Sequence, residues 1–322
     1  MRTQLSIAVL ATALTCSLAT APAHARARVF VASYGNDANP CTFGSPCKTF
    51  QVAVNVVDAG GEVTAIDSAG FGPITIKKAV IITSPDGVEA GIVASASADA
   101  IDINAGPNDT VVLRGLTLNG SGVGANGVVF NSGGTLTITN CVAQNFVGGG
   151  TTTGNGILIQ PTSGAISFVI TNTIASSNGY AGITYLPTSG SATAAGVIDH
   201  VVATNNNQGG IVIATSFGGG STTATISNSI ASNNSGVGID VENKSAPLSV
   251  SIDNSGANGN AFGISASNTA KVTLGRSVIT ANSTAGIFNS TSPNTFFSYK
   301  DNRINENSTD LSNPLNTSLA LQ

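Results

Sequence analysis

The chain has 322 residues and a formal net charge of −4, with only 9% charged residues against roughly 25% in an average soluble domain. Hydrophobic residues make up 41% of the sequence, but beyond its start no apolar run approaches the ~20 residues that a membrane-spanning helix needs. The small negative charge provides no basic surface, so neither nucleic acid nor an anionic membrane is expected as a partner.

Residues 1–25 are typical of a secretory signal peptide. An arginine at the start is followed by an apolar stretch over residues 5–14, and Ala23-His24-Ala25 forms a small-x-small cleavage site. A lipoprotein signal ending at Cys16 is the alternative, but the residues before this cysteine fit that signal less well. The sequence therefore predicts a secreted or periplasmic protein whose mature chain begins shortly after the cleavage site.

Residues 26–61 are expected to form an N-terminal cap. Val29–Val31 is predicted as a short strand, and a helix is predicted between Lys48 and Asp58. The helix follows from apolar residues at spacings of three and four, which define one face, and Gly60-Gly61 ends it. The residues of this face are Phe50, Ala53, Val54 and Val57. Such a face would cover the open end of the strands that follow.

The cysteines predict one disulfide. Cys41 and Cys47 lie six residues apart in a turn-rich loop, and export makes a bond between them plausible. This bond would hold together a loop that has no core of its own. Cys141 is left unpaired, and the pattern supports no metal site.

Residues 62–310 are expected to form a stack of short strands and turns. A glycine at the start of a repeated strand recurs at intervals of 23 to 29 residues. The positions are Gly127, Gly156, Gly182, Gly210, Gly238, Gly263 and Gly286. A period of this length indicates one supersecondary unit stacked many times. Three strands and three turns per repeat predict a solenoid roughly 40 Å long, followed by a tail over residues 311–322.

An asparagine ladder is predicted inside this stack. Ile170, Asn172 and Ile174 share one parity, so an asparagine between inward isoleucines should also point inward. Stacked amides could then bond to one another at the strand spacing of ~4.8 Å. The predicted ladder comprises Asn140, Asn172, His200, Asn228 and Asn254. His200 is interpreted as a substitute within the ladder rather than as a catalytic base.

A second set of asparagines precedes the repeated glycines. A sharp corner with positive φ is expected at or near each of them, because Asn and Gly tolerate that conformation. They are Asn178, Asn206, Asn234, Asn260, Asn282 and Asn307. The isoleucine after each glycine, such as Ile183 or Ile239, should begin a strand that packs inward.

The start of the mature chain resembles a known family. The segments Tyr34 to Pro40, Pro46 to Gln51 and Gly60 to Val63 are similar to the opening of pectate-lyase-like secreted proteins. This resemblance implies an all-β right-handed parallel β-helix of the pectin-lyase type. It leaves activity open, because the fold hosts lyases, hydrolases, epimerases, adhesins and inactive relatives.

Charged residues that share one face are the candidates for chemistry. The resemblance implies outward acid clusters that hold Ca²⁺ in lyases, or acids on neighbouring coils in hydrolases. Asp240 and Glu242 flank an inward valine and are followed by Lys244, which makes this the densest charged cluster. Asp199 and Asp253 share a column with one coil between them, about 9.6 Å apart, at the limit for a glycosidic site.

Neither group is a convincing catalytic cluster. The neighbouring coils add no further acid to the first group, and no acid is expected close enough to Arg114 or Arg276 to form a pair. The preferred hypothesis is therefore a non-catalytic module that binds polysaccharide or another surface polymer. The alternatives are a polysaccharide lyase or glycoside hydrolase of the same fold, and a structural adhesin element. Ca²⁺ would be needed only by the lyase, and no other cofactor is expected.

Overall fold

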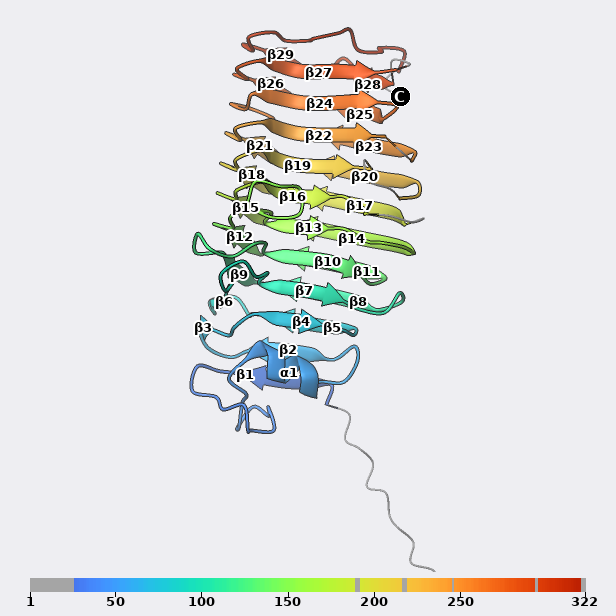
Figure 1. The fold of residues 1–322 in the computed structure, drawn as a ribbon. Coiled ribbons are helices and arrows are strands. Elements are labelled where there is room, and N and C mark those ends of the chain that lie inside the picture. The colour runs from blue at the N-terminus through green and yellow to red at the C-terminus, as the bar shows by residue number, and fades with distance from the viewer. Residues whose placement is uncertain (1–25, 189–191, 216–218, 245, 293–294, 320–322) are drawn as a thin grey trace, which may run out of the picture.

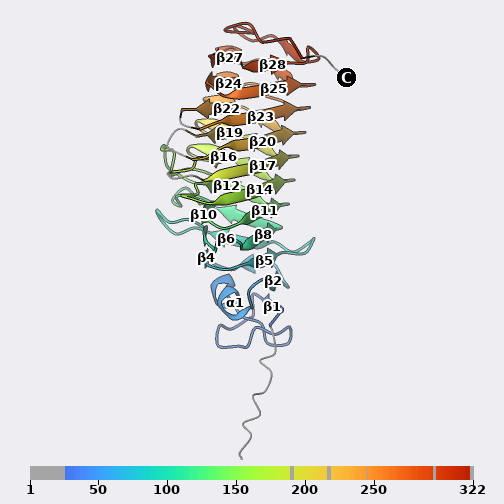
Figure 2. The same ribbon diagram turned by 90° about the vertical axis from the view of Figure 1, so that its right-hand side faces the viewer.

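The structure, a computed structural model, shows a right-handed parallel β-helix whose successive coils build three parallel sheets (Figures 1 and 2). It describes residues 26–188, 192–215, 219–244, 246–292 and 295–319. The predicted signal peptide lies outside these residues. Going round a coil, the chain passes through sheets that we name A, B and C, and a loop then returns it to sheet A.

Sheet A has eleven strands that stack in chain order (Figure 2). They are β1 (Arg28–Val31), β2 (Glu62–Ala65), β5 (Val80–Thr83), β8 (Thr110–Arg114), β11 (Thr135–Thr139), β14 (Ala165–Thr171), β17 (Thr193–Asp199), β20 (Thr222–Ser227), β23 (Leu248–Asp253), β25 (Lys271–Gly275) and β28 (Phe296–Ser298). Every pairing in this sheet is parallel, as the predicted solenoid requires.

The strands of sheet B have two to four residues, and those of sheet C have three to seven. Sheet B comprises β3 (Ala69–Gly70), β6 (Ala90–Val93), β9 (Leu116–Asn119), β12 (Val142–Gln144), β15 (Ile174–Ser176), β18 (Val202–Thr204) and β21 (Ile230–Ser232), and bridges through Gly256 continue it to β26 (Val278–Thr280) and β29 (Arg303–Asn305). Sheet C comprises β4 (Ile74–Ile76), β7 (Ile101–Asn104), β10 (Val128–Ser132), β13 (Ile157–Ile159), β16 (Ala181–Tyr185), β19 (Gly209–Ala214), β22 (Val237–Asn243), β24 (Phe262–Asn268) and β27 (Ala285–Thr291).

The predicted helix is present as α1 (Phe50–Val56), at the N-terminal end of the solenoid (Figure 1). The side chain of Thr49 caps it by accepting a hydrogen bond from the Val52 N–H group. All four residues of the predicted apolar face are at least 98% buried. The helix packs against β1, β2 and β4, a position that agrees with a capping role.

The loop before α1 contains a disulfide bond between Cys41 and Cys47, whose Cα atoms lie 4.6 Å apart. Its backbone is tied to β1: the Phe30 N–H donates to the Cys41 carbonyl, and the Cys47 N–H donates to the Phe30 carbonyl. Cys141 is a free thiol inside the solenoid, and burial raises the pKa of this thiol to about 11.

The strands after the repeated glycines pack inward, as predicted. Ile183, Ile211, Ile239, Ile264 and Ile287 are all buried. Glycine is required at the repeated glycine positions because neighbouring coils approach closely, and not because φ is positive. A Cβ atom added at Gly238 would lie 2.6 Å from the Gly263 carbonyl oxygen and 2.7 Å from the Asn260 side-chain nitrogen. The 23- to 29-residue period thus marks a column in which only glycine fits.

The ladder predicted at Asn140, Asn172, His200, Asn228 and Asn254 is placed wrongly. All five side chains are exposed, and all five residues have positive φ, between 46° and 55°. They form the corner between sheets A and B, where the left-handed conformation ends the strand alternation and turns each side chain outward. The residue after each of these five, such as Thr173 or Ser229, is the one whose side chain points inward. Ile174 and Ile230, which were expected to point inward, face solvent instead.

A buried asparagine ladder lies at the next corner, between sheets B and C. Its members are Asn178, Asn206, Asn234, Asn260 and Asn282, which are buried, and Asn307, which is partly accessible. Each side-chain Nδ2 donates to the Oδ1 of the next asparagine at 2.8 to 3.2 Å. The last member instead donates to the carboxylate of Asp310 at 3.0 Å. The positive φ expected at or near these asparagines is found at the residue before each of them, such as Ser177 or Asn205.

The segment after residue 310 continues the winding of the chain. Leu311 forms a parallel bridge with Ile287 of β27, and Asn316 forms one with Phe297 of β28. Part of the predicted tail therefore lies against the last coil.

Candidate functional site on the outer face of sheet C

Two acidic side chains project from the outer face of β22. Asp240 and Glu242 point outward, while Val241 between them is fully buried. Glu242 forms an ion pair with Lys244, with 2.8 Å between its Oε1 and the lysine Nζ. The structure thus brings together the first predicted cluster of charged residues on one face of the sheet.

Asp240 differs from an ordinary surface carboxylate. It is half-buried, and this burial is the main cause that raises the pKa of its carboxyl group to about 6. A hydrogen bond with Ser265, on the next coil, opposes the shift, and the negative charge of Glu242 adds to it. Asp240 can therefore gain or lose a proton near neutral pH, which a solvated aspartate does not do.

Tyr180 and a small apolar cluster adjoin this acidic pair. The cluster consists of Ala181, Leu186, Val212 and Ala214 on the outer side of sheet C, and Tyr180 packs against it. Burial first, and then the charges of Asp240 and Glu242, raise the pKa of the Tyr180 phenol. The phenol therefore remains a hydrogen-bond donor beside the acids.

An aromatic pair lies on the C-terminal side of the acids. In the register of sheet C, Asp240 is followed by Ser265 and then by Phe288. Phe288 is 38% exposed and packs edge to face with Phe262, with 5.5 Å between the ring centroids. The sequence pattern missed Phe288, although it follows the Gly-Ile pair of its strand as Asp240 does. We name Tyr180, Asp240, Glu242, Ser265 and Phe288 the sheet C site.

The raised pKa of Asp240 predicts a specific dependence of stability on pH. The folded protein takes up a proton near pH 6, whereas an unfolded aspartate does so near about pH 3.9. Stability should therefore rise as the pH falls from about 7 towards about 4, by about 1–3 kcal/mol from this group. Denaturant titrations measure the free energy of unfolding across this pH range. The rise at low pH should be absent in Asp240→Asn and present in the exposed control Asp86→Asn.

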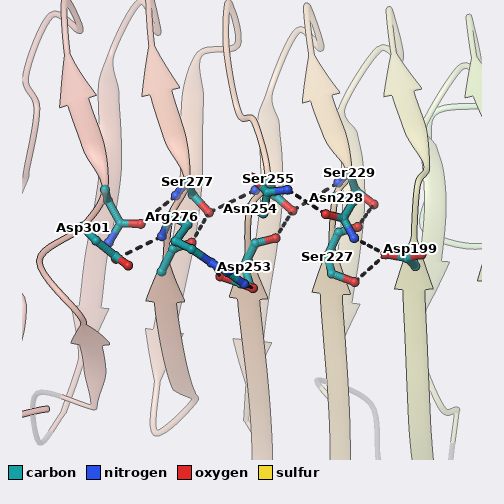
Figure 3. Close-up of polar contacts among 12 residues, drawn as sticks. Asp199, Ser227, Asn228, Ser229, Asp253, Asn254, Ser255, Arg276, Ser277 and Asp301 are labelled. Carbon is teal, nitrogen blue, oxygen red and sulfur yellow. Dashed lines mark hydrogen bonds and ion pairs between the residues drawn. The ribbon is translucent and has the colours of Figure 1, made fainter. Parts of the chain in front are cut away.

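Asp199 and Asp253 lie elsewhere, at the corner between sheets A and B (Figure 3). Asp199 accepts hydrogen bonds from Ser227 and Asn228, each at 2.7 Å. Asn228 in turn accepts from Asn254 at 2.7 Å. These contacts form a polar strip along the solenoid, which we name the corner strip. It comprises Asp199, Ser227, Asn228, Asp253, Asn254, Arg276 and Asp301 (Figure 3).

The corner strip continues through an ion pair between Asp253 and Arg276. Hydrogen bonds from Ser227, Asn228 and His200 lower the pKa of Asp199 to about 2, and Arg276 lowers the pKa of Asp253. Both groups are fixed as anions at neutral pH, so they do not form an acid–base pair. The expectation that no acid lies close to Arg276 is wrong, because its left-handed backbone lets its side chain reach the previous coil.

His200 contacts the same strip. Its Nδ1 lies 2.6 Å from Asp199 Oδ2, and its side chain is exposed. Asp199 stands between His200 and Ser227, whereas a catalytic triad requires the histidine between the serine and the acid. This arrangement supplies no activated nucleophile.

Metal binding by the acids is not supported by their surroundings. Among the described residues, no group of three or more His, Cys, Asp and Glu side chains is arranged to hold a metal ion. The neighbours of Asp240 in its column are Val212 and Ser265, whereas Ca²⁺ takes six to eight oxygen ligands. The residues of the sheet C site therefore do not fit the Ca²⁺ site that a lyase would need.

Comparison with known proteins supports the fold. No family model and no curated protein sequence matches the chain. Its structure is similar to that of the pectate lyase Pel9A, with a TM-score of 0.62 and 16% sequence identity over 92% of this chain and 81% of that one. The A-module of the Azotobacter vinelandii mannuronan C-5 epimerase AlgE4 matches with a TM-score of 0.46 and 12% identity, over 92% of this chain and 89% of that module. At such identities the likeness concerns the β-helix fold alone.

Within the described part of the chain, no helix is long and apolar enough to cross a membrane.

Proposed function

We propose that this protein is an exported β-helix that binds a polysaccharide or another surface polymer on the outer face of sheet C. The observation that carries the proposal is the juxtaposition of Asp240 and Glu242 with Tyr180 and Phe288 on that face. Carboxylates and the phenol can bond to sugar hydroxyl groups, while an exposed aromatic ring offers an apolar surface to a sugar ring. Pel9A, which shares the fold, is named as a lyase of the polysaccharide pectate.

Export is part of the proposal. The signal-like residues 1–25, with mature chain from residue 26, agree with the disulfide between Cys41 and Cys47, because such bonds persist in oxidising compartments. We propose the same division as the sequence indicates: a cap over residues 26–61, a β-helix over residues 62–310 and a terminal segment over residues 311–322.

Cleavage of the bound polymer is the second candidate. It is favoured by the raised pKa of Asp240, which suits proton transfer near neutral pH, and by the adjacent carboxylate of Glu242. Binding without cleavage is better supported, because both acids lie on one strand and the adjacent coils offer Val212 and Ser265 instead of a third acid. A glycosidic site needs two carboxyl groups on opposite sides of the scissile bond.

The test uses mature protein with a panel of acidic and neutral polysaccharides. Binding is measured by calorimetry, and cleavage by the release of reducing ends with Ca²⁺ present. We expect binding without release, and Phe288→Ala or Asp240→Asn should weaken binding about tenfold, whereas the matched control Asp86→Asn should not. New reducing ends that disappear in Asp240→Asn would establish the second candidate. Absence of binding to every polymer would favour the structural adhesin.

A further inference from the structure

Three hollows on the outer face of sheet A merge into one groove near its C-terminal end. Their volumes are about 400, 280 and 390 Å³. Ser249 and Lys271 line both of the first two hollows, and Thr225 and Ser251 line both of the last two. The groove thus follows β23 from the corner at Lys244 to the corner strip, and we name it the sheet A groove.

The floor of the groove is made of free hydroxyl groups. Thr225, Ser251 and Thr273 lie side by side in the register of β20, β23 and β25 and point outward. Ser251 is exposed, and its two neighbours are at least partly accessible. None of the three hydroxyl groups bonds to another protein group among the described residues. They are therefore available to hydrogen-bond a ligand with many hydroxyl groups.

Two aromatic side chains form a wall at the C-terminal side of the groove: Tyr299 lines the third hollow, and Phe297 adjoins Thr273 and Lys271, which line the second. Phe297, in β28, lies beside Thr273, and Tyr299 is two residues further along the same face. Tyr299 leans over Gly275, where an added Cβ would lie 3.2 Å from the tyrosine ring. Both rings are half-buried and keep an accessible part. This wall provides apolar surface beside the hydroxyl floor, which is the combination that sugar rings require.

The groove also contains a cation without an acidic partner. Lys271 is exposed, forms no ion pair among the described residues, and its Nζ lies 5.8 Å from the centroid of the Phe297 ring. The other cations at the groove are both engaged: Lys244 is paired with Glu242, and Arg276 with Asp253. The acids of the groove, Asp253 and Asp301, line its third hollow together with Arg276, whereas Lys271 lines the first two. Lys271 is therefore the group that would select a negatively charged ligand, at the end of the groove away from these acids.

We propose that the sheet A groove is a second carbohydrate-binding site, which takes a short acidic oligosaccharide. Phe297 and Tyr299 pack against the sugar rings, the three hydroxyl groups bond to the sugar hydroxyls, and Lys271 pairs with a carboxylate of the sugar. The floor from Ser249 to Asp253 spans about 13 Å at the rise of a strand, which suits a few linked sugars rather than one. This site lies on a different sheet from the sheet C site and does not depend on it.

The test maps binding by amide NMR of the labelled mature protein, titrated with a galacturonate tetramer and separately with a neutral galactose tetramer. Shifts at Ser249, Ser251 and Thr273 with the acidic tetramer, and weaker ones with the neutral tetramer, are expected. Shifts confined to the sheet C site would overturn this proposal and leave the proposed function standing. Shifts confined to the groove would support the second site and contradict binding at the sheet C site. No shifts at millimolar concentrations of either tetramer would contradict both proposals.

Variants show how much the charge of Lys271 and a hydroxyl group of the floor contribute to the affinity for the acidic tetramer. Lys271→Gln should weaken binding of the acidic tetramer about tenfold, and Thr273→Val, which removes one hydroxyl group, should weaken it several-fold. Lys77→Gln is the matched control, since Lys77 is exposed on the N-terminal part of the solenoid, outside the groove. Equal affinity of Lys271→Gln and wild type, with unchanged amide spectra elsewhere, contradicts the proposal.

Discussion

Replacing Asn234 by alanine is expected to lower the free energy of unfolding by roughly 2–5 kcal/mol, because this residue stands in the middle of the buried ladder. Its Nδ2 donates to the Ala203 carbonyl at 3.2 Å and to Asn260 Oδ1 at 3.0 Å. Its Oδ1 accepts from both the backbone N–H and the Nδ2 of Asn206, each at 3.0 Å. Alanine leaves these buried groups without partners, each at a cost of about 1–3 kcal/mol.

Chemical denaturation of the variant, followed by circular dichroism, measures this loss. Asn228→Ala is the matched control, since Asn228 is also an asparagine at a corner of the solenoid but is exposed to solvent. Its loss should be smaller, about 1–2 kcal/mol, because water replaces the hydrogen bonds with Asp199 and Asn254 and the remaining cost is that of alanine at positive φ. Equal losses in the two variants would mean that the buried ladder does not stabilise the fold more than the exposed corner does.

Gly238→Ala is expected to destabilise the protein by about 1–3 kcal/mol. The new methyl group would lie 2.6 Å from the Gly263 carbonyl oxygen and 2.7 Å from Asn260 Nδ2, so the stacked coils must separate. Alanine also restricts the unfolded chain, which favours folding by about 0.4–1 kcal/mol. The steric cost exceeds this gain, because the methyl group would contact a backbone carbonyl and a hydrogen-bonded amide of the ladder, and neither can easily move.

A second glycine supplies the control for this substitution. Gly149 lies in a loop, its φ is not positive, and a Cβ added there would meet no atom within 4 Å. Gly149→Ala should therefore leave stability unchanged or raise it slightly. The thermal midpoints of the two variants check the argument, and a midpoint for Gly238→Ala at or above that of wild type would refute the close approach of the coils.

Much of the fold follows from the repeat, but the ladder does not. The glycine period predicts stacked coils, and the strand after each glycine packs inward as expected, as at Ile183 and Ile239. Parity counting fails at the corner after each sheet A strand, because one residue such as Asn172 adopts positive φ and shifts the alternation by one position. A single positive φ is not visible in a pattern of apolar residues.

The candidate site was predicted only in part. Alternation along β22 correctly places Asp240 and Glu242 on one outward face. The raised pKa of Asp240 could not be predicted, because it arises from burial on the folded surface near Tyr180, which is 60 residues earlier in the chain. The ion pair between Asp253 and Arg276 was missed for a similar reason, since it joins side chains of different coils.

The one-way donation within the buried ladder gives the solenoid an electrical polarity. Every hydrogen bond between these asparagine side chains is donated towards the C-terminus, while each amide also donates to a carbonyl of the preceding coil. The side-chain dipoles therefore share one direction along the row, as peptide dipoles do in an α-helix. The positive end of this row meets the carboxylate of Asp310, which accepts from both the side chain and the backbone N–H of Asn307. Asp310 thus occupies the place that an acidic residue takes at the N-terminus of a helix, and the row of amides ends on a compensating charge.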